Sequence, residues 1–413
     1  MFRLPILAVA TGLVGASVWT APGATPQEAS TTIRAARLFD GKGQLLTGRV
    51  IEVRGTRIAA IDGRTGPVTS DLGDVTLMPG LIDVHTHVDW HFQPSGRYGR
   101  REGDPQETPE QARAAIAKNL EATLLAGFTT VQNVGSRGDA DLRAAVEAGT
   151  LAGPRILTSL GQIQGSRRGE PLSPDMLREQ VRALKAAGAD VIKIFASESI
   201  RSGGAPTMSQ AQLDAACGEA KAQGLRTLVH AHASEAIVRA VNAGCSQVEH
   251  GAFASNEALG LMRDRGVYFD PNIGLVLQNY IEHKDRFMGF GSYNEEGFAF
   301  MEKAVGDKSE MFGRAVRSGV RMPLGTDAVA GAHGQNAREI IVRVQTGQPA
   351  RDALIGATSL AAESLGLGAR IGTLAPGFEA DIIAVAGNPL EDITKTRDVR
   401  FVMKGGKIYS RKP

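Results

Sequence analysis

The sequence predicts an α/β protein in two parts, a (β/α)8 TIM barrel and a β-sandwich built from both ends of the chain. Three observations support this prediction. Short apolar runs alternate with helical patterns through the middle of the chain, strand-like runs occur near both ends, and glycine, at 50 of 413 residues, is frequent enough for many tight turns. We expect the sandwich at residues 31–78 and 372–410, and the barrel at residues 79–371.

The first residues, 1–24, have the pattern of a secretory signal peptide. Arg3 supplies a positive charge, an apolar run extends from Leu4 to Trp19, and small residues follow at 21–24. This run is short for a membrane span. We therefore expect a periplasmic or secreted protein that leaves the membrane after cleavage, with a disordered tail or a membrane anchor as the alternatives.

The two ends of the chain share a texture of short alternating runs separated by glycines. Near the start these runs include Arg49–Arg54 and Arg57–Asp62, and near the end they include Ala380–Ala386 and Val399–Lys404. Each end is too small to bury a core by itself. We therefore expect the two ends to pack together as one sandwich, with the barrel inserted between them.

The middle of the chain alternates strand and helix patterns, which favours parallel strands linked by helices. The predicted strands are Leu81–Val88, Thr129–Val134, Arg155–Leu160, Asp190–Ala196, Arg226–Ala231, Gln247–Gly251, Val267–Asn272 and Met322–Ala328. The predicted helices are Pro109–Ala126, Pro174–Ala187, Ser209–Gln223, Glu235–Ala243, Asn256–Arg265 and Phe298–Arg317. An open doubly wound sheet is the alternative. The segment Ile273–Gly297 is expected to be a long connection over the active site.

Composition excludes some classes of function. Lys and Arg number 46 against 44 Asp and Glu, so the formal charge of +2 gives no broad basic face for nucleic acid. The two cysteines, Cys217 and Cys245, do not suggest a disulfide framework. We expect them to be small buried hydrophobic residues, although an exported protein would permit one disulfide.

The first barrel strand carries a histidine pair in Leu81–Val88. Residues two apart on a strand face the same way, so His85 and His87 project together. Two neutral imidazoles on one rigid strand form half of a metal site. An isolated pair of this kind is common as ordinary core or surface histidine. Whether the pair binds a metal therefore depends on finding further ligands downstream in the sequence.

Further polar residues lie on or at the ends of later predicted strands, where barrel chemistry is found. They are Lys193, His230, His232, His250 and Asp327. With His85 and His87, the set holds five of the eight histidines of the protein, which makes chance scatter a poor explanation.

This set resembles the amidohydrolase superfamily, in its branch with two metal ions. The matching motifs are Gly80-Leu-Ile-Asp-Val-His-Thr-His, the lysine on the fourth strand, Val229-His-Ala-His, Glu249-His-Gly and Gly325-Thr-Asp-Ala. The chain is most similar to prolidase-like and imidazolonepropionase-like amidohydrolases, over about Ile33 to Tyr409.

The resemblance implies two divalent metal ions, expected to be zinc. His85, His87 and Asp327 would bind one ion, His230 and His250 the other, and a carboxylated Lys193 would bridge them. A hydroxide between the metals would attack the carbonyl, with Asp327 as the general base. The expected function is hydrolysis of C–N bonds in amides or peptides, as in a dipeptidase, a carboxypeptidase or an N-acyl amino acid amidase.

The residues on the substrate side are less specific. His232 shares a strand face with His230 and is expected to donate a hydrogen bond to the carbonyl or oxyanion, or else to pack behind the site. His333 matches a recurrent family motif and would contact substrate or order a loop. Arg201 is a candidate clamp for a substrate carboxylate, although most loop arginines are simply solvated. The chain departs from many relatives at Gln132-Asn133 and at Ser197–Arg201, so their specificity cannot be transferred.

Two other functions compete with this interpretation. A deaminase or cyclic-amide hydrolase with one metal would use the His-x-x-Glu spacing of His232 and Glu235, but it has little use for a bridging lysine. A scaffold protein that has lost its chemistry is the third possibility, and the complete ligand set argues against it. The substrate, the native metal and the formation of a homo-oligomer are not determined by the sequence.

Overall fold

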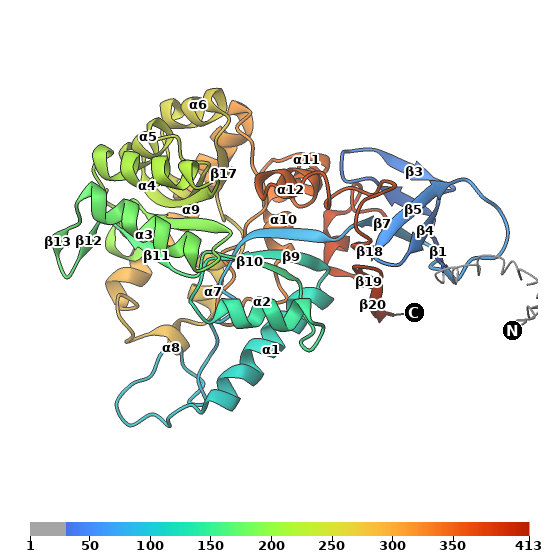
Figure 1. The fold of residues 1–413 in the computed structure, drawn as a ribbon, viewed down its shortest axis with the longest axis horizontal. Helices are drawn as coiled ribbons and strands as arrows, with labels where there is room; N and C mark the ends of the chain where they lie inside the picture. The colour runs from blue at the N-terminus through green and yellow to red at the C-terminus, as the bar shows by residue number, and fades with distance from the viewer. Residues whose placement is uncertain (1–29, 413) are drawn as a thin grey trace, which may run out of the picture.

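The computed structural model describes residues 30–412, and the predicted signal peptide lies outside these residues. Figure 1 shows a strand-rich end, formed by the first and last parts of the described chain, beside a larger body of strands and helices. Among the described helices, none is both long and apolar enough to cross a membrane.

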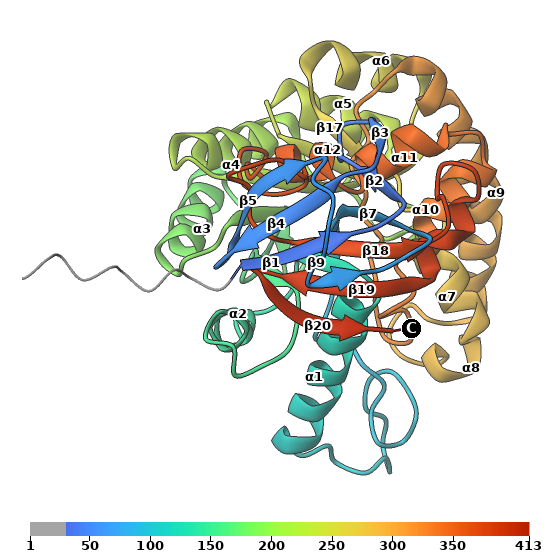
Figure 2. The same cartoon turned by 90° about the vertical axis from the view of Figure 1, so that its right-hand side faces the viewer.

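The strand-rich end contains two sheets, with strand orders β5-β4-β1-β6 and β20-β19-β18-β7-β2-β3. The second sheet joins both ends of the chain, because β7 pairs antiparallel with β18. Figure 2 shows β1, β4 and β5 next to β18, β19 and β20. The strands are β1 Ser30–Arg34, β2 Arg37–Phe39, β3 Leu45–Thr47, β4 Val50–Arg54, β5 Arg57–Asp62, β6 Ser70–Asp71, β7 Val75–Pro79, β18 Ile382–Ala386, β19 Val399–Lys404 and β20 Lys407–Arg411.

A shared apolar core holds these two sheets together. Ile33 and Ile51 from the first sheet pack in one cluster with Leu77, Ile382 and Phe401 from the second. Neither end of the chain could bury these side chains by itself, which is the physical reason for a composite sheet pair. The exact domain boundaries stay a prediction.

The body contains two parallel sheets. One has the order β10-β9-β8 and the other β11-β14-β15-β16-β17. Seven of the strands predicted from the sequence are found here, with small shifts at their ends. Their bounds are β8 Leu81–Thr86, β9 Phe128–Asn133, β10 Arg155–Thr158, β14 Val191–Phe195, β15 Arg226–Ala233, β16 Gln247–Phe253 and β17 Tyr268–Asp270, with the short β11 Gln162–Gln164 and the hairpin β12 Ser166–Arg167 and β13 Glu170–Pro171 added.

The prediction of an eighth strand at Met322–Ala328 is wrong, because this segment does not form a regular β-strand. Pro323 has no N–H to give to a ladder, and Asp327 has a left-handed φ of 52°. The segment nevertheless runs beside β8, since Val84 N donates to Leu324 O at 2.9 Å and Asp327 N donates to His85 O at 2.7 Å. The structure therefore gives two sheets with this segment beside them, rather than one closed ladder.

Helices surround these sheets, and all six predicted helices are present. Local signals explain where helices begin. For example, Thr108 forms a capping box with Gln111 before the proline that begins α1.

The segment Ile273–Gly297 is not an open loop, because it contains the helices α7 and α8. The bounds are α1 Pro109–Leu125, α2 Asp139–Glu147, α3 Pro174–Ala186, α4 Gln210–Ala222, α5 Ser234–Asn242, α6 Asn256–Arg265, α7 Val276–Glu282, α8 Lys284–Phe287, α9 Glu295–Ser318, α10 Ala337–Gln345, α11 Ala350–Gly356 and α12 Ser359–Ser364, with 3-10 turns η1 Ile200–Ser202 and η2 Ile393–Arg397.

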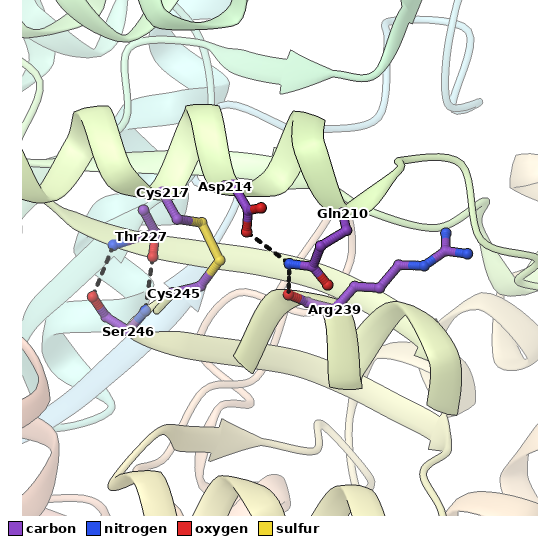
Figure 3. The surroundings of a disulfide bond; sticks show 7 residues. All are labelled: Gln210, Asp214, Cys217, Thr227, Arg239, Cys245 and Ser246. Carbon is purple, nitrogen blue, oxygen red and sulfur yellow. Dashed lines mark hydrogen bonds between the residues drawn. A yellow bond between two sulfur atoms is a disulfide. The ribbon is translucent and has the colours of Figure 1, made fainter. Parts of the chain in front are cut away.

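The two cysteines are buried, as expected, but they are bonded to each other rather than free. Cys217 on α4 forms a disulfide with Cys245, which lies between α5 and β16 (Figure 3). Beside it, Thr227 N donates to Ser246 Oγ at 3.3 Å, and Ser246 N donates to Thr227 Oγ1 at 2.8 Å. The bond fixes the two segments on either side of β15 to each other.

Candidate active site

A cavity of about 190 Å³ opens where β8, β14, β15 and β16 end. The structure brings together here all the residues that the sequence assigned to metal binding and catalysis, although they come from separate strands. The cavity is lined by His85, His87, Lys193, His230, His232, His250 and Asp327.

His85 lies at the centre of this cluster, and its two ring nitrogens have different neighbours. Nδ1 is 2.6 Å from Glu249 Oε2, which orients the ring. Nε2 lies 3.3 Å from Lys193 Nζ and 3.5 Å from Asp327 Oδ1. Asp327 Oδ1 is also 3.1 Å from His87 Nε2. Four groups from three parts of the chain thus meet at one point.

The remaining histidines form a second group on the neighbouring strands β15 and β16. The His230 ring lies 4.5 Å from the His250 ring and 4.7 Å from the His232 ring, centroid to centroid. His232 stacks on His250 at 5.0 Å. Because the His85 and His250 rings are 5.4 Å apart, the two groups are continuous.

The backbone of two cluster residues is held in an uncommon conformation. His250 and Asp327 have φ angles of 69° and 52°, in the left-handed region that non-glycine residues seldom adopt. Such a conformation costs about 1–3 kcal/mol, and it persists when the surroundings impose it. The surroundings are tight here: a Cβ on Gly325 would lie 1.9 Å from Asp270 Oδ2. Strain of this kind concentrates at functional sites.

Burial sets the charge of the cluster. It lowers the pKa of His85 and of His230 to about 3, and the charge of Lys193 adds to the effect. Burial also holds the pKa of His232 and His250 well below the ordinary value, and it lowers the pKa of Lys193. For Asp327, burial alone would raise the pKa, but His85, His87 and Lys193 keep it below its ordinary value. The imidazoles of His85, His230, His232 and His250 are therefore neutral, and the Asp327 carboxylate is charged.

These donors fit a divalent metal ion. Ligand atoms of His85, His250 and Asp327 all lie within 4.8 Å of one another. Neutral imidazoles and a carboxylate are the ligands that zinc prefers, and the imidazole lone pairs are available because burial disfavours protonation. His87 Nδ1 and His232 Nδ1 are buried without a hydrogen-bond partner in the described chain.

Beneath the cluster lies a set of buried charges that we call the charge network: Glu249, Asp270, Glu339 and Arg343. Arg343 donates to Asp270 Oδ1 at 2.8 Å and to Glu339 Oε1 at 2.9 Å. Glu249 contacts His85, and burial raises its pKa to about 7. No role for these four residues was predicted from the sequence, although Glu249 stands beside His250 in a matched motif.

Asp83 was also missed. Its Oδ1 accepts hydrogen bonds from the backbone N–H groups of His85, at 3.1 Å, and of Thr326, at 3.0 Å. It therefore ties β8 to the segment that carries Asp327. A signal was present, because Asp83 lies two residues before His85 and so shares its strand face.

The cavity lining outside the histidine cluster, which we call the cavity wall, combines aromatic and aliphatic residues with two cations. Arg201 lies over the Tyr293 ring at 4.1 Å and donates to Ser292 Oγ at 3.1 Å. Lys308 on α9 is 2% exposed and donates to Asn272 O at 2.7 Å, and burial lowers its pKa to about 8. The residues of the cavity wall include Trp90, Phe195, Ile200, Arg201, Val276, Leu277, Tyr280 and Lys308.

Two residues singled out from the sequence do not line the cavity. His333 Nε2 is 3.2 Å from the carbonyl oxygen of Trp90, whose ring stacks on His87 at 4.5 Å. His333 is thus placed behind Trp90. Glu235 lies in the first turn of α5, is 63% exposed and pairs with Arg239, so the His-x-x-Glu spacing does not bring it to the cluster.

Comparison with known proteins gives the cluster its context. The family model described as "Amidohydrolase family" matches residues 76–409, which span the body and the strands β18 and β19 of the strand-rich end, together with most of β7 and β20. This chain belongs to the amidohydrolase family. It is therefore a hydrolase, and the resemblance inferred from the sequence motifs is confirmed.

The relatives of this amidohydrolase cover nearly its whole length. Ochratoxinase from Aspergillus niger is 27% identical over 432 residues, which cover 93% of this chain and 88% of the relative. Imidazolonepropionase from Acidiphilium cryptum (strain JF-5) is 24% identical, covering 83% of this chain and 89% of the relative. A solved structure of a Xaa-Pro dipeptidase with methionine bound in its active site is similar with a TM-score of 0.82 and 30% identity, covering 92% of this chain and 100% of that one.

Proposed function

We propose that this amidohydrolase cleaves C–N bonds of amides or peptides with two divalent metal ions, as a dipeptidase, a carboxypeptidase or an N-acyl amino acid amidase. One observation carries the proposal: Lys193, 1% exposed, places Nζ 3.3 Å from His85 Nε2 inside the histidine cluster. A lysine is an unusual neighbour for metal ligands unless it acts as one. The similarity to an ochratoxinase and to a Xaa-Pro dipeptidase supports the same class of reaction.

The division of the metal ligands between two ions is taken from the family resemblance, and the presence of all these side chains in one cavity supports it. His85, His87 and Asp327 would hold one ion, and His230 and His250 the other. The Lys193 amine, in its deprotonated form, would add to carbon dioxide, forming an N–C bond and releasing one proton. The resulting carbamate is an anion with two oxygens, so it suits a bridge between two cations. We expect zinc, since the ligands are imidazoles and carboxylates.

The protein's own residues would then divide the chemistry. Bound metals would supply a hydroxide nucleophile and polarise the carbonyl of the scissile amide. Asp327 would take the proton of the attacking group and pass it to the leaving nitrogen. His232 would donate a hydrogen bond to the carbonyl oxygen as it gains negative charge. Arg201 would bind a substrate carboxylate, which its place on the cavity wall supports.

The position of His333 supports a different role from a direct substrate contact. Its hydrogen bond to the Trp90 carbonyl would keep the Trp90 ring against His87. We therefore propose that His333 positions Trp90.

A barrel closed by Met322–Ala328 and export to the periplasm or the medium belong to the same proposal. The hydrogen bonds between this segment and β8 support the barrel. The disulfide of Cys217 and Cys245 supports export, because disulfides persist mainly in oxidising compartments.

The imidazolonepropionase relative supports a second candidate, a cyclic-amide hydrolase or deaminase with one metal. The exposed position of Glu235 and the buried position of Lys193 argue against it. Metal counting separates the two candidates. We expect two equivalents per chain, with loss of activity on chelation and recovery on adding zinc, whereas one equivalent would favour the alternative.

A substrate screen tests the activity itself. The purified protein should hydrolyse members of a library of Xaa–Yaa dipeptides and N-acyl amino acids in preference to lactams. Hydrolysis of lactams alone would favour the cyclic-amide hydrolase. Failure on every amide, with both metal sites filled, would contradict the proposed function.

A further inference from the structure

Lys308 is a charged residue in the active-site cavity for which the proposed mechanism has no use. It comes from α9 rather than from a strand end, and yet it lines the same cavity as the histidine cluster. Its residue surface is 2% exposed. Lysine is among the residues least often buried to this degree, so its position needs a reason.

The contacts of Lys308 leave most of its hydrogen-bonding capacity free. Nζ donates to Asn272 O at 2.7 Å, and no carboxylate oxygen of residues 30–412 lies within 4.0 Å of it. An ammonium has three N–H groups, and one carbonyl uses one of them. A buried cation without a counter-ion costs several kcal/mol, so such a group is kept where something else provides negative charge.

The same molecule shows what a purely structural buried cation looks like. Arg343, 1% exposed, bonds to two carboxylates, Asp270 and Glu339. Lys308 has no such pairing. Of these two buried cations, the one that lines the cavity is the one without a carboxylate partner.

The position of Lys308 within the cavity shows which group it would meet. Lys308 lines the same cavity as His232 and His250, whose rings stack on each other at 5.0 Å. His250 is a candidate metal ligand and His232 a candidate donor to the substrate carbonyl. The oxygen of the scissile carbonyl would therefore lie within reach of Lys308.

We propose that Lys308 is a further catalytic residue, which donates a hydrogen bond to the scissile carbonyl oxygen as this oxygen becomes negative. The inference rests on the proposed function. Attack forms a bond from the nucleophile oxygen to the carbonyl carbon, and the carbonyl π pair moves onto its oxygen beside the ammonium. Lys308 keeps its proton, and the C–N bond then breaks with the proton for nitrogen coming from Asp327.

The test compares Lys308→Met with Lys308→Arg and with Lys303→Met. Lys303 is a matched control on the same helix, with its side chain 71% exposed and 2.6 Å from Asp307. Each variant is assayed on an N-acyl amino acid and on the corresponding neutral amide. Thermal unfolding and metal content are measured in parallel, because they detect a merely structural role.

We expect Lys308→Met to lower kcat about 10²-fold on both substrates, with little change in KM, as for loss of one oxyanion donor. Lys308→Arg should retain part of the lost rate, and Lys303→Met should match the unmodified protein. Unchanged kcat in Lys308→Met would overturn the inference. A higher KM for the carboxylated substrate alone would also overturn it, because Lys308 would then bind the carboxylate. A lower kcat that is explained by lower metal content or lower stability would overturn it as well. An unmodified protein that cleaves no amide overturns the proposed function itself, before any variant is compared.

Discussion

The charge network beneath the histidine cluster and the cavity wall beside it hold their cations in different ways. In the network, Arg343 bonds to two buried carboxylates. On the wall, Arg201 and Lys308 have no carboxylate oxygen within 4.0 Å in the described chain, and they contact a hydroxyl, aromatic rings and a carbonyl instead. The charge of Arg343 is therefore neutralised inside the network, which suits a structural role. Cations without partners leave the wall ready for a negatively charged ligand.

Asp327, which lies beside His85 and His87 in the cavity, should show the largest effect on turnover. Asp327→Asn keeps the shape of the side chain but removes its charge, so it cannot accept the proton of the nucleophile. We expect kcat to fall by at least about 10³-fold. Thermal unfolding should be nearly unchanged, and metal content is measured to separate loss of the base from loss of an ion. Activity close to that of the unmodified protein would refute the role of Asp327.

Arg343 tests whether the network is structural. Arg343→Met leaves Asp270 and Glu339 buried without their cation, which should lower the free energy of unfolding by about 3–5 kcal/mol. Denaturant unfolding measures this. The matched control is Arg338→Met on the same helix, because Arg338 pairs with Glu282 at the surface and its loss should cost at most about 1 kcal/mol. If both variants lower the free energy of unfolding by the same amount, the charge network is not a special structural support.

Arg201 tests the wall, with the smallest and most selective expected effect. Arg201→Met should reduce kcat/KM about 10- to 100-fold on substrates with a free carboxylate, because a charge-assisted hydrogen bond is lost. Neutral amides should be hydrolysed as before, and the free energy of unfolding should change by less than about 1 kcal/mol. The ratio of kcat/KM for paired carboxylated and amidated substrates is the measurement. If kcat/KM falls equally for both substrates, Arg201 does not bind the substrate carboxylate.

Much of the site could be predicted because strand periodicity is a local property. His85 and His87 share a face through their two-residue spacing, and the ends of parallel strands meet at one edge. The same reasoning reached Lys193, His250 and Asp327, which the structure brings into one cavity.

The missed features depend on contacts between distant parts of the chain. Lys308 has the spacing of an ordinary surface lysine, and only the packing of α9 turns it inward. The pairing of Cys217 with Cys245 depends on how α4 and α5 pack, which residue counts do not reveal. The expected strand at Met322–Ala328 failed because Pro323 and the left-handed Asp327 interrupt the ladder, although the polar residue was placed at the correct rim.

The pairing of β7 with β18 has a consequence for synthesis on the ribosome. The first strands emerge early, but their partner follows only after the whole body has been made. Until then β7 exposes Leu77 and Met78 together with an unpaired backbone edge, a combination that favours aggregation. A nascent chain that ends before β18 can therefore form the helices of the body and still expose the apolar, unpaired edge of β7.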